Sequence, residues 1–295
     1  MRRGILSKGR LQEPEAHNIS AVMSRRKQPV RNRDGSPVPA GAKPRHTRPR
    51  DGTGAANDAY LYGFHAVLAA LANPHRLAER LCLSRNAEAE LARQGARLPA
   101  DLPVRPEIME NDAIAALLPA GAVHQGIALR TSPLPDLDVI EACEGANRAI
   151  VLDQVTDPHN FGAILRSAAV FGATALITTE RHSPALGGAL AKAASGALER
   201  VKIARITNLV RAIEELKELG FEVIGLDGES ETALPDLKLS PRVALVLGAE
   251  GAGLRRLTRE HCDLLARLPA AGTMTSLNVS NAAAVALYEL YRRAS

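Results

Sequence analysis

The second half of the chain alternates short apolar runs with longer segments of helical periodicity. From Arg148 on, apolar runs predict strands at 149–152, 174–178, 222–225, 243–247 and 264–268. Apolar residues at helical spacing predict helices at about 160–171, 185–194, 207–219 and 277–293. Short apolar strands that alternate with helices are typical of a parallel sheet covered on both faces. The pattern therefore predicts an α/β domain over 148–295, with ligands bound at the carboxyl ends of its strands.

A smaller pattern precedes this domain. The stretch 60–71 passes from a strand-like opening into an apolar helix, and the runs at 80–84 and 124–130 predict two further strands. Together they indicate a small α/β domain over 58–132. The following stretch, 133–147, opens with proline-rich turn residues and predicts a linker.

The composition excludes several classes of protein. No run of eighteen apolar residues occurs, so the sequence predicts no membrane span. Cys82, Cys143 and Cys262 are widely spaced and form no CxxC pair, which is typical of thiols in a reducing compartment and not of disulfides or a metal site. The histidines show no metal-binding pair, and the chain opens with no secretory signal pattern. We expect a cytoplasmic protein without a metal.

Three loops carry the chemically informative residues. The first, 157–167, starts a helix near Asn160. Helical spacing places one apolar stripe toward the core, formed by Phe161, Ile164, Leu165 and Ala168. Arg166 falls outside this stripe, so it is either an ordinary surface arginine or a cation that reaches the loop region.

The second loop, 247–254, has three glycines in GxxGxG spacing, which permits positive φ angles and close backbone approach to a ligand. A dinucleotide fold would have GxGxxG. Glu250 inside this loop would repel a phosphate, so a neutral or cationic ligand is favoured. In the third loop, 268–281, Ser276 and Asn278 precede an alanine-rich helix. They either cap that helix or join a ligand site at its exposed amides.

In this order and spacing, the three loops resemble the signature motifs of the SPOUT superfamily, in its TrmH-like 2′-O-ribose methyltransferase branch. The matching segments are Asn160-Phe-Gly-x-x-x-Arg166, Leu247-Gly-x-Glu-Gly-x-Gly253 and Leu268-Pro-x-x-Gly-x-x-x-Ser-Leu-Asn-Val-Ser280. Upstream, Tyr62-Gly-Phe-His-Ala-Val67 and Gly121-Ala-Val-His-Gln-Gly126 resemble the small substrate-binding domain of RlmB-type guanosine methyltransferases, which act on 23S ribosomal RNA.

The resemblance implies a C-terminal domain with a trefoil knot, a small L30e-like RNA-binding domain before it, and a homodimer through the C-terminal domain. It implies S-adenosylmethionine as methyl donor, and the residues implied to hold this cofactor are Leu247, Gly248, Glu250, Gly253, Leu268, Leu277 and Asn278. The residues implied as catalytic are Asn160, Arg166, Glu250, Ser276 and Asn278. The implied reaction is 2′-O-methylation of a ribose, most similar to that of a guanosine in 23S ribosomal RNA.

Elementary chemistry agrees with this reaction. Methyl transfer from a sulfonium is an in-line displacement that depends on positioning of the nucleophile, and a cation near the 2′-oxygen eases loss of its proton. The acceptor of that proton stays open among a substrate phosphate, water and Arg166. Three alternatives also stay open: a transfer RNA guanosine as the target, a non-catalytic RNA-binding protein, and a Rossmann-type methyltransferase, for which 51–54 is a poor glycine motif.

Tyr60, Tyr62 and Phe64 either stack on bases or pack in the core.

The basic character of the chain belongs to its N-terminal tail. Residues 1–57 hold 13 Lys and Arg and 4 Asp and Glu, a net charge of +9. Residues 58–295 hold the other 24 Lys and Arg and 28 Asp and Glu, a net charge of −4. Without hydrophobic periodicity, this composition predicts a disordered basic tail. It is either an electrostatic arm that binds RNA phosphates, whose removal should flatten the salt dependence of binding, or a solvated segment without a role. A mitochondrial presequence and translation from Met23 are further alternatives.

Overall fold

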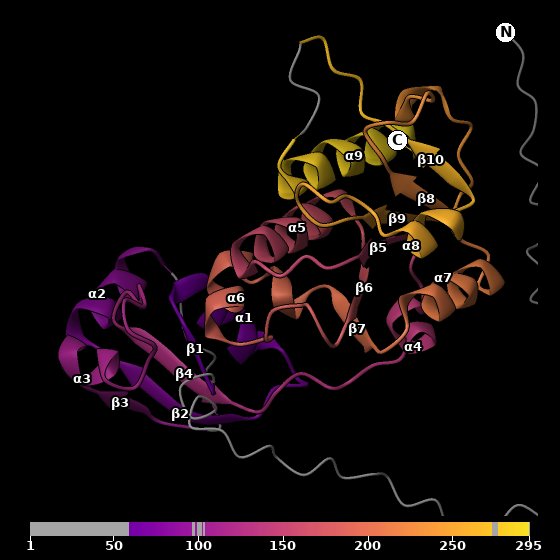
Figure 1. Cartoon of the computed structure of the whole chain (residues 1–295). Helices are drawn as coiled ribbons and strands as arrows, with labels where there is room; N and C mark the ends of the chain where they lie inside the picture. The colour runs from indigo at the N-terminus through magenta and orange to yellow at the C-terminus, as the bar shows by residue number, and fades with distance from the viewer. Residues whose placement is uncertain (1–58, 96–97, 99–101, 103, 273–276, 295) are drawn as a thin grey trace, which may run out of the picture. The chain divides into compact units, whose positions relative to one another are not determined.

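The structure is a computed structural model that describes residues 59–95, 98, 102, 104–272 and 277–294. The predicted tail over 1–57 and Ser276 lie outside these residues. Figure 1 shows the described chain as two sheets with their helices, one built from the strands before residue 132 and one from the strands after residue 147.

The larger sheet has six strands in the order β10-β8-β9-β5-β6-β7, and every neighbouring pair is parallel. Its strands are β5 (Arg148–Leu152), β6 (Ala175–Thr179), β7 (Lys202–Ile206), β8 (Glu222–Leu226), β9 (Val243–Leu247) and β10 (Leu264–Ala266). The predicted parallel sheet is confirmed. Strand β7 was not predicted, because Lys202 and Arg205 interrupt its apolar run at the sheet edge.

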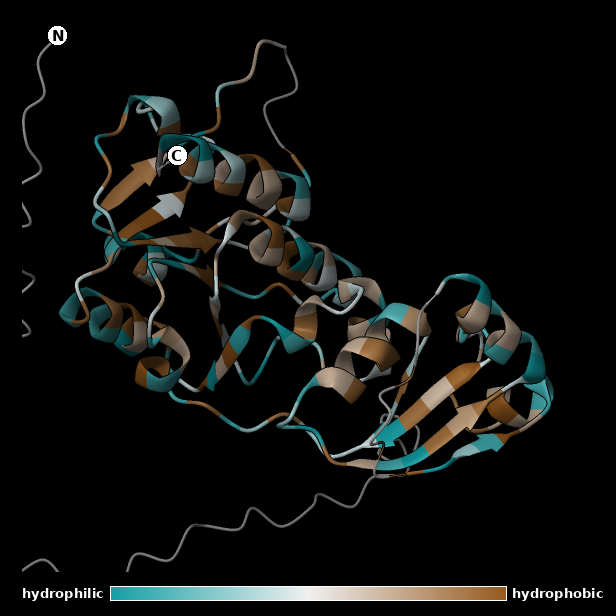
Figure 2. Cartoon of the chain, turned by 180° about the vertical axis from the view of Figure 1, so that it is seen from behind, coloured by the Kyte–Doolittle hydropathy of each residue, from teal (hydrophilic) through white to brown (hydrophobic). Residues whose placement is uncertain are grey.

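Helices cover both faces of this sheet, as predicted. They are α4 (Val139–Cys143), α5 (Pro158–Phe171), α6 (Gly188–Ala194), α7 (Leu209–Glu218), α8 (Arg256–Glu260) and α9 (Val279–Ala294), with the short 3-10 helices η1 (Ala197–Glu199) and η2 (Leu234–Asp236). Alternate residues of β5 point to opposite faces, so Ile150 and Leu152 belong to one core cluster and Ala149 and Val151 to the other. Figure 2 shows the strands as mostly hydrophobic, which fits burial on both sides.

Helix α5 begins where its sequence favours a start. The Asp157 side chain accepts a hydrogen bond from the backbone N–H of His159 at 3.0 Å, and Pro158 occupies the first helical position, where its missing N–H costs nothing. The helix ends at Gly172, which takes the left-handed conformation with φ 76°. The apolar stripe predicted for this helix is buried.

The smaller sheet has the order β1-β4-β2-β3. Its strands are β1 (Tyr60–Tyr62), β2 (Ala78–Leu83), β3 (Pro106–Ile108) and β4 (Ile127–Thr131), and its helices are α1 (Phe64–Ala72), α2 (Arg85–Arg93) and α3 (Asn111–Ala115). Tyr60, Tyr62 and Phe64 are at most 8% exposed. They therefore pack in the core, and the alternative in which they stack on bases is disfavoured.

The segment predicted as a linker contains helix α4. A capping box starts this helix: the Glu141 backbone N–H donates to the Asp138 carboxylate at 2.8 Å, and the Asp138 N–H donates to the Glu141 carboxylate at 3.1 Å. Just before it, Leu137 forms a parallel bridge with Ala204 of β7. This segment is thus ordered against the edge of the larger sheet.

A buried ion pair joins the loop after α1 to η1. The Arg76 guanidinium donates to both carboxylate oxygens of Glu199, from Nη2 at 2.7 Å and from Nε at 3.1 Å. Asn73 Nδ2 adds a third hydrogen bond to Glu199 at 2.6 Å, and Arg76 Nη1 donates to the carbonyl of Ser132 at 2.8 Å. The two charged side chains are only 3% and 4% exposed.

None of the described helices is long and apolar enough to cross a membrane. The three cysteines are free thiols. Burial raises the pKa of Cys143 to about 11 and that of Cys262 to about 12, so both thiols stay protonated and weakly nucleophilic at neutral pH. Within the described ranges, no three His, Cys, Asp or Glu residues gather closely enough to bind a metal ion.

Candidate active site

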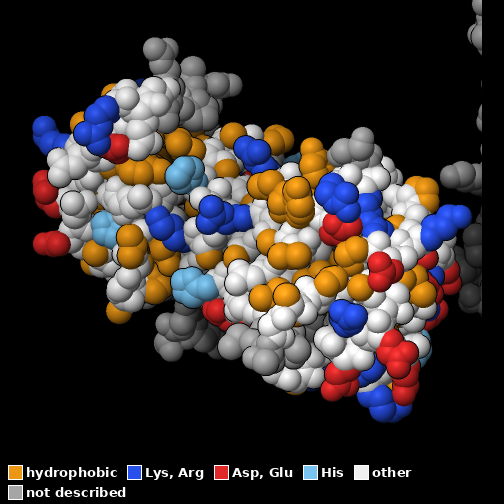
Figure 3. Space-filling model, turned by 90° about the horizontal axis from the view of Figure 1, so that it is seen from above, with side chains coloured by type: hydrophobic (Ala, Val, Ile, Leu, Met, Phe, Trp, Pro, Cys, Tyr) orange, Lys and Arg blue, Asp and Glu red, His pale blue; other side chains and the backbone are white. Residues whose placement is uncertain are grey.

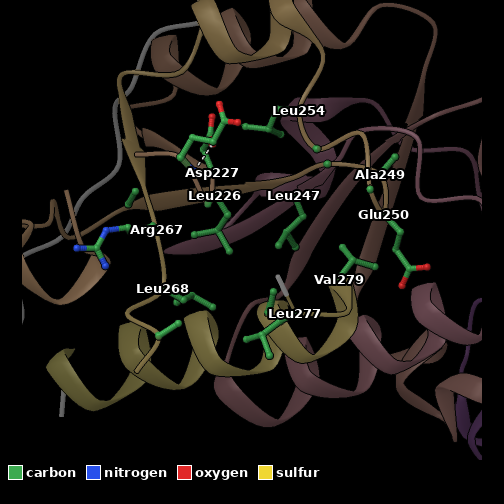
Figure 4. A pocket seen from close by; sticks show the side chains of 18 of the residues that line it. Leu226, Asp227, Leu247, Ala249, Glu250, Leu254, Arg267, Leu268, Leu277 and Val279 are labelled. Carbon is green, nitrogen blue, oxygen red and sulfur yellow. Dashed lines mark hydrogen bonds between the residues drawn. The ribbon is translucent and has the colours of Figure 1, made fainter. Parts of the chain in front are cut away.

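A cavity of about 700 Å³ lies where β8, β9 and β10 end, beside the start of α9. Figure 4 shows the side chains of Leu226, Leu247, Leu268 and Leu277 around it, with Glu250 and Arg267 at opposite sides. Six of the seven residues predicted to hold the cofactor line this cavity, namely Leu247, Gly248, Glu250, Gly253, Leu268 and Leu277. One cavity is thus enclosed by the ends of three strands and by the loops at 248–254 and 267–272.

The glycine loop after β9 is folded tightly on itself. Ala249 and Gly253 exchange backbone hydrogen bonds of 3.1 and 2.9 Å. A Cβ atom on Gly248 would lie 2.1 Å from the carbonyl carbon of Gly253, so no larger residue fits there. Gly251 and Gly253 have φ angles of 76° and 66°. The predicted positive φ angles are confirmed at two glycines, whereas the close approach at Gly248 is to the backbone of Gly253 and not to a ligand.

Replacing Gly248 with alanine should therefore force the loop open. We expect affinity for S-adenosylmethionine to fall about tenfold, because lining backbone atoms would move by tenths of an ångström or more. Gly228→Ala is the matched control, since Gly228 also lines the cavity but a Cβ there meets nothing within 4 Å. Calorimetric titration with the cofactor measures both variants, and equal affinities would contradict the role given to this close approach.

Polar side chains from the three loops converge beside the cavity. Asn160 Nδ2 donates to Glu250 Oε1 at 3.0 Å, and Asn278 Nδ2 donates to Asn160 Oδ1 at 3.1 Å. Asn278 Nδ2 also donates to the same oxygen of Glu250. Glu250 and Asn278 lie 90 and 118 positions after Asn160 in the sequence, yet each of the three side chains contacts the other two. We call Asn160, Glu250 and Asn278 the polar triangle.

Asn278 has a second function at the same time. Its side-chain Oδ1 accepts a hydrogen bond from the backbone N–H of Ser280 at 2.9 Å. Its backbone carbonyl accepts one from the N–H of Ala282 at 2.9 Å, and the two bonds together start helix α9. The helix-cap interpretation of Asn278 is therefore confirmed, and its membership of a ligand site stays a prediction. The side-chain oxygen Oδ1 caps the helix, while the side-chain nitrogen Nδ2 donates to Asn160 and Glu250.

Arg166 makes no hydrogen bond with the polar triangle. It is exposed on α5, and its side chain makes no hydrogen bond or ion pair with a described residue. The structure thus confirms that Arg166 is off the buried stripe but does not bring it to Glu250. Ser276 lies outside the described residues.

Sequence reasoning missed four charged residues of the cavity wall, namely Asp227, Glu229, Arg259 and Arg267. Asp227 follows β8 directly, and its carboxylate lies 2.9 Å from Arg259 Nη1 and accepts the N–H of Glu229 at 2.9 Å. It is a lining residue, 11% exposed. Its position immediately after a strand, at the ligand-binding edge of a parallel sheet, is the signal that could have identified it.

Comparison with known proteins identifies the chain. The profile of the SpoU rRNA methylase family matches residues 147–288, and that of an RNA 2′-O ribose methyltransferase substrate-binding family matches residues 60–137. The 23S rRNA (guanosine-2′-O-)-methyltransferase RlmB of Pseudomonas aeruginosa is 40% identical over 246 residues, which cover 79% of this chain and 96% of that protein. The chain belongs to the SpoU rRNA methylase family. The resemblance noted in the three loops is thereby confirmed.

Further relatives agree with SpoU membership. RlmB of Escherichia coli is 40% identical over 252 residues, which cover 80% of this chain and 98% of that protein. Among solved structures, the SpoU methyltransferase AviRb of Streptomyces viridochromogenes in complex with AdoMet has a TM-score of 0.68 at 21% identity, covering 83% of this chain and 94% of that one. At this identity the structural similarity establishes the fold.

Proposed function

We propose that this SpoU-family protein transfers a methyl group from S-adenosylmethionine to the ribose 2′-hydroxyl of a guanosine in 23S ribosomal RNA. The observation that carries the proposal is the polar triangle at the side of a leucine-lined cavity. Relatives that are 40% identical over almost their whole length are named 23S rRNA (guanosine-2′-O-)-methyltransferases, which supports the choice of RNA and base.

The chemistry of the cavity fits S-adenosylmethionine. Leucine side chains and glycine backbone suit an adenine ring, and the volume of about 700 Å³ lies within the range of about 300–1,000 Å³ typical of small-molecule sites. The lining carries three carboxylates, those of Asp227, Glu229 and Glu250, and two guanidinium groups, those of Arg259 and Arg267, so its net negative charge favours a positively charged ligand. When bound, this cofactor supplies an electrophilic methyl group on a positively charged sulfur.

The protein's own residues then position the nucleophile. In the reaction, the bond from the 2′-oxygen to the methyl carbon forms as the sulfur–carbon bond breaks, S-adenosylhomocysteine leaves, and the hydroxyl proton passes to a substrate phosphate or to water. We infer that the polar triangle fixes the Glu250 carboxylate and orients the ribose, with Ser276 adding a hydroxyl donor. Arg166 holds a substrate phosphate and stabilises negative charge that develops on the 2′-oxygen.

Methyl incorporation tests this function. The purified protein is incubated with tritiated S-adenosylmethionine and either 23S ribosomal RNA or transfer RNA from a strain that lacks the enzyme. We expect label in 23S RNA, at the 2′-oxygen of a guanosine when mapped. Label in transfer RNA alone would favour the other target, and RNA binding without label in either would favour a non-catalytic protein.

We also infer a homodimer through the C-terminal domain. Helices α5 and α9 pack side by side and carry exposed apolar residues, with Val170 71%, Val285 48% and Tyr288 51% exposed. Phe171 links the two helices, since its ring lies 5.8 Å from that of Tyr288 in an edge-on arrangement. Figure 3 shows a band of hydrophobic side chains on the face that contains these helices. Apolar residues gathered in this way are typical of a protein interface.

Val285→Asp should therefore weaken the dimer, because a buried unpaired carboxylate costs several kcal/mol. Light scattering at micromolar concentration should show a dimer for the wild type and a shift toward monomer for this variant. Ile140→Asp is the matched control, since Ile140 is 59% exposed but lies on α4. A monomeric wild-type protein would contradict the inference.

Family membership supports the finer features as well. We infer a trefoil knot in the domain over 148–295, an L30e-like fold for the domain over 58–132 and a linker at 133–147. The convergence of the loops at 248–254 and 267–272 with α9 around one cavity supports the knot. We further place the protein in the cytoplasm and propose that the basic segment 1–57 binds RNA phosphates, on the basis of its net +9 charge.

A further inference from the structure

A second cavity, of about 630 Å³, opens at the carboxyl ends of β5, β6 and β7. Its walls come from Gln154, from the loop at 179–182, from the start of α7 at 207–210 and from the start of α8 at 255–258. Helices α7 and α8 lie next to each other beside the sheet (Figure 1). Of the residues predicted for the cofactor or for catalysis, none that the structure describes lines this second cavity.

Arginine side chains dominate its charged lining. Arg255 Nε donates to Asp153 Oδ1 at 2.6 Å, and the Asp153 side chain is 0% exposed. This buried carboxylate holds the guanidinium in place, while the terminal nitrogens Nη1 and Nη2 make no hydrogen bond with a described residue. A planar guanidinium with its two terminal nitrogens free is suited to a bidentate phosphate contact.

The other charges around the cavity are distributed unevenly. Arg181 is exposed and its side chain has no partner among the described residues. Arg256 forms an exposed ion pair with Glu260 at 2.6 Å, and Glu180 contributes one carboxylate to the lining. Among the described arginines of the lining, Arg181 therefore carries the unpaired positive charge, and Arg255 adds a guanidinium whose terminal nitrogens are free.

The backbone here is held in unusual conformations. Of the four described non-glycine residues with positive φ, two line this cavity, Gln154 with 64° and His182 with 62°. Such conformations cost about 1–3 kcal/mol each and are concentrated at ligand sites. Leu257, which is 50% exposed, and Val210 add apolar surface next to the arginines. A ligand with both a flat apolar part and an anionic part matches this lining.

We propose that this cavity binds a nucleotide that flanks the methylated one in the RNA substrate, with its phosphate on Arg181 and Arg255 and its base against Leu257. The proposal rests on the proposed RNA methyltransferase function. It is favoured over a free nucleotide because the cavity shares its loops with the polar triangle: Asp153 and Gln154 begin the segment that leads to Asn160, and Arg255 follows Glu250 by five residues. One RNA strand can therefore engage both sites.

The test compares Arg181→Ala with Lys202→Ala in the full chain. Lys202 also carries one positive charge, but it starts β7, at the opposite end of the sheet. We expect Arg181→Ala to weaken binding of a 23S RNA transcript about tenfold and to lower the slope of log Kd against log salt by about 0.7–0.9, as for one lost phosphate contact. Lys202→Ala should change neither, and S-adenosylmethionine affinity should stay at the wild-type value in both.

Arg255→Ala should weaken RNA binding by a similar factor. Because this variant leaves the Asp153 carboxylate without its arginine, its RNA affinity is interpreted only if its unfolding midpoint equals that of the wild type. Wild-type RNA affinity and salt slope in Arg181→Ala would overturn the proposal. So would micromolar binding of guanosine monophosphate that is lost in Arg181→Ala while RNA affinity is retained. Because these readouts measure binding, they are separate from the proposed function, which fails if the wild-type protein binds RNA but transfers no methyl group.

Discussion

Arg166→Ala should lower the turnover of methyl transfer by about 10²–10³-fold while S-adenosylmethionine still binds within a few-fold of wild type. Loss of one electrostatic contact to a developing oxyanion typically has an effect of about this size. Arg166 projects from α5 and does not line the cavity, so cofactor binding should not depend on it. It is exposed and makes no hydrogen bond with a described side chain, so its removal should not disturb the fold.

Two further variants sharpen this test. Arg166→Lys should restore little activity, because a point charge does not reproduce the planar two-nitrogen contact with a phosphate. Arg211→Ala, which removes an arginine 79% exposed on α7, should leave turnover unchanged. Calorimetry gives the cofactor affinity, and tritiated donor gives the methyl incorporation. Near-normal turnover of Arg166→Ala would show that Arg166 is an ordinary surface residue.

Glu199→Ala should lower the free energy of unfolding by about 3–5 kcal/mol. Breaking a buried ion pair from one side leaves the other charge without a partner in a poorly solvated place. Here Arg76, whose side chain is 3% exposed, would keep only its hydrogen bond to the Ser132 carbonyl. Urea unfolding followed by circular dichroism measures the loss.

A double variant separates the cost of an unpaired charge from the value of the pair. Replacing Arg76 and Glu199 together with methionine should restore most of the lost stability, because apolar side chains often substitute for a buried ion pair, with a remaining cost from the Asn73 amide and the Ser132 carbonyl, which lose these partners. The exposed pair Arg211–Glu215 serves as a control, and its removal should change stability by about 0.3–0.5 kcal/mol. If Glu199→Ala matched that small value, the buried contact would not hold α1 and η1 together.

Hydrophobic periodicity was sufficient to predict the parallel sheet and its main helices. It failed where tertiary contacts compensate for a weak local pattern. Strand β7 has Lys202 and Arg205 in five residues, and the five-residue helix α8 is too short for a helical period to be recognised. The helix predicted from 185 begins only at Gly188, after Gly187. The buried pair of Arg76 and Glu199 is invisible in the sequence, since 123 positions separate its members.

The candidate site was predicted from motif resemblance more than from physical pattern. Local chemistry explained the glycines at 248, 251 and 253, because their roles are set within the loop itself. It could not explain why Asn160, Glu250 and Asn278 meet, since their contact depends on the order of strands in the sheet. Asp227 was missed although it directly follows a strand, because the loop after β8 carries none of the three motifs.

The double use of Asn278 restricts which amino acids selection can accept at that position. Aspartate would keep the acceptor for the Ser280 N–H but would place a second carboxylate against Glu250. Serine or threonine would cap α9 but is too short to donate to Asn160 and Glu250 as the amide does. Only a short side chain with both an acceptor and a donor satisfies the Ser280 N–H and the Glu250 carboxylate together. Substitution of Asn278 by the other residues that make good helix caps should therefore be selected against.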